Sequence, residues 1–94
     1  MAVTIKFIGA LRHVSGKTEL IISVKDEVAL KELLSRMSQE MPQLEKTFSD
    51  QQPNDSTSNA LILVNGREIS VLKGLETKIN DGDEIVFVPV VHGG

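Results

Sequence analysis

The stretch DGDEIVFVPVVHGG, at residues 81–94, predicts a turn, a strand and a tail in succession. The Asp and Gly residues at its start are typical of a turn, and residues 84–88 (EIVFV) are apolar at positions that face both sides of a sheet. Such a strand is covered on both faces, either by its own domain or by a partner. Pro89 cannot donate a ladder hydrogen bond, so we expect the strand to end there and residues 90–94 to form a tail.

The first half of the chain predicts two strands and one helix. Residues 3–8 alternate between two sides with a period of two, and residues 18–24 return to β-rich sequence after a short break, which indicates a hairpin. The period then changes to that of an amphipathic helix, which Pro42 limits near residues 40–41. Ala29, just before this helix, is a poor capping residue. The apolar stripe of the helix consists of Leu30, Leu33, Leu34, Met37 and Met41.

The second half predicts a polar loop followed by a hairpin. Residues 49–59 (SDQQPNDSTSN) contain no apolar residue, which indicates a mobile surface loop. Residues 60–64 (ALILV) are apolar on both faces, and Asn65-Gly66 is a strong signal for a hairpin turn into a short strand at residues 67–71. One domain accounts for all these elements, because neither side of the loop is large enough to fold alone.

The predicted order of elements defines the fold class. Strand, strand, helix, strand, short strand and strand form an α+β arrangement, a mixed sheet of four to five strands packed on one main helix. The parity that turns Phe7, Ile62 and Phe87 toward the helix leaves apolar residues on the other face. Such a patch usually marks a protein interface. The alternative is that the twist of the sheet and the loops of this chain cover these residues. These residues are Ile8, Leu61, Leu63, Val86 and Val88.

Composition argues against several classes of function. The chain has 94 residues, of which 40% are apolar and 24% charged, as is ordinary for a globular protein. A net charge of −3 without a Lys/Arg cluster argues against a nucleic-acid partner, and the lack of a membrane-length apolar run or a signal peptide predicts a cytoplasmic protein. The absence of cysteine excludes disulfides and an internal thiol nucleophile, and His13 and His92 are too far apart in sequence to suggest a metal site.

These features together resemble the β-grasp sulfur carriers, most nearly the MoaD-type small subunit of molybdopterin synthase. Residues 81–94 are similar to that family's carboxyl end almost position by position. Arg12 and Gly16 are similar to its amino-terminal signature, and residues 64–66 to its central hairpin. The similarity spans the chain except for the polar loop and residues 72–78.

The resemblance implies a fold and a division of the chain. Residues 1–89 are expected to form a ubiquitin-like β-grasp domain, and residues 90–94 a flexible diglycine tail that is ordered only in a partner. Glycine has no Cβ, so Gly93 and Gly94 fit a channel that is too narrow for other residues. The free chain is expected to be a monomer that binds no cofactor of its own.

The resemblance also implies the chemistry of Gly94. An adenylating enzyme similar to ubiquitin-activating enzymes uses ATP and Mg²⁺ to convert the Gly94 carboxylate to an acyl-adenylate. A persulfide from another protein then replaces AMP and leaves a Gly94 thiocarboxylate. The tail inserts into the large subunit of molybdopterin synthase and delivers sulfur to a pterin precursor. The chain contains no base–nucleophile pair and no phosphate-binding loop, so the partners supply the catalytic groups.

Partner contacts are expected on the uncovered sheet face, in the loop after the first strand and along the tail. Arg12 either pairs with an acidic residue of a partner or is an ordinary solvated arginine. His92 is expected to contact the partner's channel rather than to shuttle protons. The predicted partner-binding residues are Ile8, Arg12, Leu61, Leu63, Val86, Val88, Val91, His92 and Gly93.

Other functions share the same activated terminus. The ending His92-Gly93-Gly94 is similar to that of the eukaryotic ubiquitin-related modifier used in tRNA thiolation. Transfer of the activated Gly94 to a lysine amine is a second alternative, which makes the chain a ubiquitin-like protein modifier. A thiamin-pathway sulfur carrier is a third, against which the strand end at residues 87–89 argues mildly. A β-grasp interaction domain with an incidental diglycine is the last.

Overall fold

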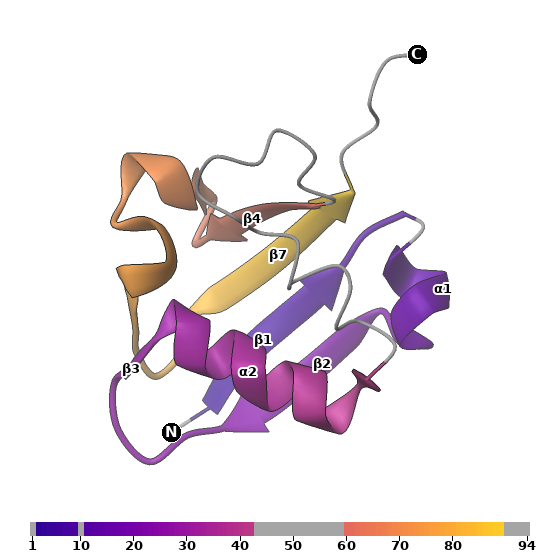
Figure 1. Ribbon diagram of the computed structural model, residues 1–94, viewed down its shortest axis with the longest axis horizontal. Coiled ribbons are helices and arrows are strands. Elements are labelled where there is room, and N and C mark those ends of the chain that lie inside the picture. Colours follow the sequence, from indigo (N-terminus) through magenta and orange to yellow (C-terminus); the bar gives the residue numbers. More distant parts are fainter. Residues whose placement is uncertain (1, 10, 43–59, 90–94) are drawn as a thin grey trace.

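The structure is a computed structural model that describes residues 2–9, 11–42 and 60–89. Its main sheet has five strands in the order β2-β1-β7-β4-β5, and α2 crosses one face of it (Figure 1). The predicted α+β arrangement is therefore confirmed, whereas the predicted loop at residues 49–59 and tail at residues 90–94 lie outside the described residues. The elements are β1 (Ala2–Phe7), α1 (Leu11–Ser15), β2 (Glu19–Ser23), β3 (Val28–Ala29), α2 (Leu30–Glu40), β4 (Ala60–Val64), β5 (Arg67–Glu68), the 3₁₀ turns η2 (Ile69–Val71) and η3 (Gly74–Glu76), β6 (Lys78–Ile79) and β7 (Glu84–Pro89).

The sheet is mixed because its two central strands run in the same direction. β1 pairs with β7 in parallel, whereas β2 pairs antiparallel with β1 and β4 antiparallel with β7. The predicted pairing of the first two strands is confirmed. Their connection contains the short helix α1, which was not predicted from the sequence, and β1 ends at Phe7 rather than at Ile8. Within the described ranges, no helix is long and apolar enough to span a bilayer.

The core lies between α2 and the sheet, with the parity that the sequence predicts. Phe7, Ile62 and Phe87 are buried, and the rings of Phe7 and Phe87 stack with centroids 5.8 Å apart. The whole apolar stripe of the helix is buried as well. Ala29 precedes α2 without a side-chain cap, and the amide of Leu30 instead donates to the carbonyl of Thr77 at 2.8 Å. A backbone group from a distant segment therefore caps this helix.

The segment after the Asn65-Gly66 turn differs from the predicted strand at residues 67–71. Of these residues, only Arg67 and Glu68, which form β5, pair with β4, after which the chain turns into η2. The turn forms because the Glu68 carboxylate accepts a hydrogen bond from the amide of Ser70 at 3.0 Å. β6 then pairs with β3 in a second, two-stranded sheet that was not predicted.

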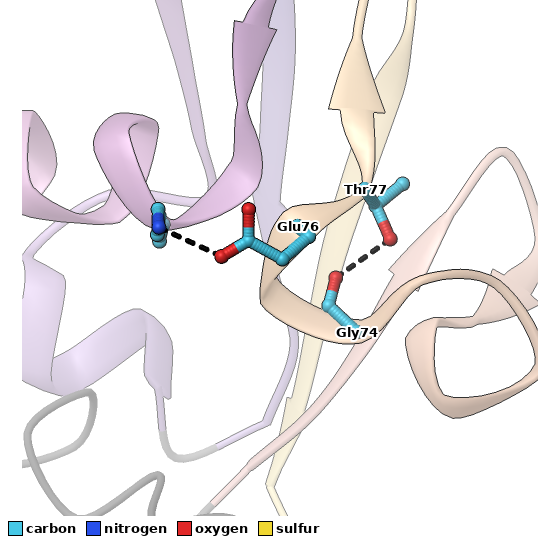
Figure 2. Close-up of polar contacts among 4 residues, drawn as sticks. Gly74, Glu76 and Thr77 are labelled. Carbon is cyan, nitrogen blue, oxygen red and sulfur yellow. Dashed lines mark hydrogen bonds and ion pairs between the residues drawn. The ribbon is translucent and has the colours of Figure 1, made fainter.

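Polar contacts attach η3 to the helix layer (Figure 2). Lys31 of α2 donates to Glu76 at 2.7 Å, and this hydrogen bond lowers the pKa of the Glu76 carboxyl below its ordinary value. The hydroxyl of Thr77 donates to the carbonyl of Gly74 at 2.6 Å. Both side chains of the ion pair are mostly exposed, so its contribution to stability is small.

The fold predicts how a single methyl group should affect stability. Ile85 of β7 is fully buried, so we expect Ile85→Val to lower the free energy of unfolding by about 1 kcal/mol. The matched control is Ile21→Val, because Ile21 of β2 is 63% exposed and loses the same methyl group. The control should change stability by less than about 0.5 kcal/mol. Urea denaturation measures both, and equal losses would contradict the described core.

Candidate functional site

The sheet face opposite α2 carries apolar side chains from its central strands. Leu61 lies opposite Val88 and Leu63 opposite Val86 in the register of β4 and β7. Ile8 lies beside Val88, because its amide continues the parallel ladder by donating to the carbonyl of Phe87 at 3.1 Å. Leu61 and Ile8 are 44% and 41% exposed, and the other three are half-buried. We call these five residues the apolar face.

The apolar face contains every sheet residue that was predicted to contact a partner. The structure brings them together from three segments that are distant in sequence. Their orientation away from the helix is confirmed, because their strand neighbours Ile62, Ile85 and Phe87 are buried beneath α2. Contact with a partner stays a prediction.

Two cations border the apolar face on the side of β1. Lys6 lies beside Val86 in the parallel register, and its ammonium is 3.0 Å from the carboxylate of Glu84. The hydrogen bond to Glu84 raises the pKa of Lys6 above its ordinary value of 10.5, so Lys6 is charged at neutral pH. Arg12 is exposed on α1 and shares a hollow of about 380 Å³ with Lys6 and Ile8. A complementary partner surface would be apolar with an acidic border.

The acidic turn at residues 80–83, before β7, lies at the end of the sheet where β1 and β7 begin. The amide of Ala2 donates to Asp81 at 2.8 Å, and the amide of Asn80 donates to Asp83 at 2.7 Å. The Asn65 side chain donates to Asp83 and accepts from the amide of Glu84, both at 3.0 Å. This turn therefore connects the starts of β1 and β7 to the β4–β5 hairpin, which is a structural role for the acidic residues of the motif.

The remaining predicted site residues belong to the tail. Val91, His92, Gly93 and Gly94 lie outside the described residues, so their roles stay predictions. The described chain ends at Pro89, and β1 and β7 point toward the same end of the sheet, where α1 also lies (Figure 1). Ile8 and Arg12 are thus near the point from which the chain continues to residue 90. Within residues 2–9, 11–42 and 60–89, no three His, Asp or Glu side chains are grouped to hold a metal ion.

The site residues predicted from the sequence did not include two residues that the structure places here, Lys6 and Gly9. Lys6 has the same strand parity as Ile8, so the alternation at residues 3–8 already indicated that it borders the apolar face. Gly9 lies so near Pro89 that a Cβ added at Gly9 would be 3.1 Å from the proline Cγ. No local pattern indicates this proximity, because the two residues come from opposite ends of the chain.

Comparisons with known proteins agree on one family. The model of the ThiS family matches residues 5–94. Small archaeal modifier protein 3 of Haloferax volcanii is 27% identical over 94 residues, which cover 100% of both chains. A protein of Archaeoglobus fulgidus described as a sulfur carrier protein is 52% identical over 33 residues, which are 35% of this chain and 38% of that protein.

Solved structures confirm the predicted ubiquitin-like β-grasp fold. The solution structure of small archaeal modifier protein 1 from Methanosarcina acetivorans has a TM-score of 0.75 and 31% identity, covering 99% of this chain and 96% of that chain. A chain in the complex of subunits 1 and 2 of molybdopterin-converting factor from Helicobacter pylori has a TM-score of 0.63 and 26% identity, and 100% of both chains is covered.

Proposed function

The chain belongs to the ThiS family, and from this premise we propose that it is a sulfur carrier whose reacting group is the carboxylate of Gly94. The observation that carries the proposal is that the family match runs through the diglycine to residue 94. The apolar face and its two cations support it, because they form a docking surface beside the point where the tail begins. The chain itself is a substrate and not an enzyme, and it acts in the cytoplasm.

The proposed reaction starts with an adenylating enzyme that binds ATP and Mg²⁺. The Gly94 carboxylate attacks the α-phosphorus, pyrophosphate leaves, and an acyl-adenylate forms. The terminal sulfur of a donor persulfide then attacks the acyl carbon and displaces AMP. A second thiol of the donor cleaves the resulting acyl disulfide, so the donor ends as a disulfide and Gly94 as a thiocarboxylate. The absence of cysteine in this chain leaves no internal thiol to intercept the adenylate.

We assign the sulfur to molybdopterin synthesis, with this chain as the small subunit of the synthase. The support is the similarity to a chain of the Helicobacter pylori molybdopterin-converting factor complex. In that assembly the apolar face would bind the large subunit, while the tail carries the thiocarboxylate to the pterin precursor. Placement of the reacting carboxyl by a docked domain contributes proximity, and the large subunit contributes the acid–base groups.

A protein modifier is the second candidate function. The similarity to small archaeal modifier protein 3 extends over both whole chains, and this observation favours it. Activation is the same, and only the acceptor differs, because a lysine amine replaces the sulfur donor at the acyl carbon. Mass spectrometry of cellular proteins distinguishes the two, since only a modifier leaves peptides joined to this chain through an isopeptide bond.

We expect the chain isolated from its own cells to carry a thiocarboxylate. Exchange of one oxygen for sulfur adds about 16 Da to the intact mass. The chain should be purified with an amino-terminal tag, because a carboxyl-terminal tag removes the reacting group. A chain lacking Gly94 is the control and should keep its unmodified mass. Unmodified mass for both chains, in cells that are making molybdopterin, would contradict the assignment.

A further inference from the structure

Gly9, just after β1, lies beside the ring of Pro89 at the end of β7. Gly9 follows β1 with φ +62°, and Pro89 is the last residue of β7. A Cβ added at Gly9 would lie 3.1 Å from Cγ and 3.7 Å from Cδ of the Pro89 ring. Position 9 therefore favours glycine on two independent grounds, the left-handed backbone and the proximity of the proline ring.

The hydrogen bonds around this contact show why the two residues depend on each other. The amide of Ile8 donates to the carbonyl of Phe87 at 3.1 Å. The next bond of this parallel ladder would run from the amide of residue 89 to the carbonyl of Ile8, but proline has no N–H. The Ile8 carbonyl instead accepts from the amide of Leu11 at 3.3 Å. Pro89 thus ends the pairing of β1 with β7, and the freed carbonyl takes part in the turn that starts α1.

Pro89 is held from two sides. Gly9 and the start of α1 lie on the side of β1, where the amide of Arg12 donates to the carbonyl of Gly9 at 3.1 Å. On the other side, Pro89 pairs with Ala60 of β4 in the antiparallel register. The ring also restricts φ of Pro89 to about −65°. The last described residue of β7 is therefore held in position relative to the apolar face.

We propose that the close approach of Gly9 to Pro89 fixes the starting point of residues 90–94 relative to the apolar face, with Gly9 as a positioning residue for the chemistry at Gly94. This inference rests on the proposed function. Five residues after Pro89 span at most about 18 Å, so a shift of Pro89 relative to a docked apolar face changes how far the terminus reaches into the partner's site. A misplacement of about 1 Å is enough to reduce a reaction rate roughly 100-fold.

A matched pair of alanine substitutions separates positioning from backbone strain. Gly9→Ala adds a Cβ against Pro89, whereas Gly74→Ala adds one at a similar φ of +56° with nothing within 4 Å. Gly74 lies in the η3 turn, where its carbonyl accepts a hydrogen bond from the Thr77 hydroxyl (Figure 2). A Cβ added there would approach no other residue. The assay is ATP–pyrophosphate exchange with the adenylating enzyme of the same organism, at equal concentrations of folded chain.

We expect Gly9→Ala to lower kcat by about 10- to 100-fold, with KM for the chain changed by less than about threefold, because docking through the apolar face is kept. Gly74→Ala should change both constants by less than about threefold. In a Pro89→Ala background the proline ring is absent. Adding Gly9→Ala to that background should therefore lower kcat by less than about threefold relative to Pro89→Ala alone. Equal losses for Gly9→Ala and Gly74→Ala, or equal effects of Gly9→Ala in both backgrounds, would overturn the inference.

Two further outcomes keep the test decisive. If Gly9→Ala does not fold, Pro89→Ala alone tests the inference. It removes the proline ring and restores an N–H that competes for the Ile8 carbonyl. It should lower kcat about tenfold with KM nearly unchanged, and an unchanged kcat overturns the inference. If the wild-type chain supports no exchange, the proposed function fails and this inference fails with it. An active wild-type chain with no coupling between Gly9 and Pro89 overturns this inference alone.

Discussion

Deletion of Gly94, or addition of any residue after it, is expected to abolish ATP–pyrophosphate exchange while leaving the free energy of unfolding unchanged. The proposed reacting group is the terminal carboxylate. Deletion moves this group back by one residue, or about 3.5 Å. An added residue replaces it with an amide. Stability should be retained because the described core lies within residues 3–87.

The measurement compares the native, Gly94-deleted and carboxyl-extended chains in the exchange assay, with urea denaturation of each. A chain extended at its amino end is the matched control and should retain exchange, because the addition is at the opposite end of the molecule from the reacting group. Gly93→Ala should have a severe but smaller effect, since a Cβ must enter a channel that fits glycine. Equal exchange from all chains would show that the terminal carboxylate is not the substrate.

Leu61→Glu is expected to weaken binding to the adenylating enzyme by about 100-fold or more, because it places a charge within an interface that the proposed docking would desolvate. Leu61 is 44% exposed and lies on the apolar face opposite Val88. Its carboxylate would remain in contact with water in the free chain, so the free energy of unfolding should fall by less than about 1 kcal/mol. Titration calorimetry with the purified enzyme measures the affinity.

Val71→Glu is the matched control for Leu61→Glu. Val71 lies in η2, is 73% exposed and does not belong to the apolar face. Both variants add one negative charge in place of an apolar side chain, so a general electrostatic effect would weaken binding equally in the two. Binding that is lost only with Leu61→Glu supports docking through the apolar face, whereas unfolding of that variant would show that the facing of β4 is misassigned.

The main elements of the fold were predictable because each is encoded within a short window of sequence. The stripe from Leu30 to Met41 repeats with the helical period, and all of its members are buried. Asn65-Gly66 predicted a hairpin turn, and both residues have positive φ, 51° and 86°. The two-residue period of strands, with Phe7, Ile62 and Phe87 turned inward, was enough to assign the members of the apolar face to one side of the sheet.

The sequence pattern was not enough where a side chain bonds to the nearby backbone or where distant segments determine local structure. The pattern at residues 67–71 suggests a strand, yet the Glu68 carboxylate stabilises a 3₁₀ turn after two residues. α2 begins at Leu30 although Ala29 is a poor cap, because the carbonyl of Thr77 accepts its amide. The small β3–β6 sheet has only two residues in each strand, which is too short for a periodic signal.

For the candidate site, the sequence alone predicted which residues lie on the sheet face opposite α2, and its resemblance to the family indicated which terminus carries the reacting group in the proposed function. Only the tertiary structure placed Lys6 beside Glu84, and Gly9 against Pro89. Those contacts depend on the parallel pairing of β1 with β7, which joins the two ends of the chain. Side-chain periodicity is a local property of the backbone, whereas the pairing of distant strands arises only when the whole core is packed.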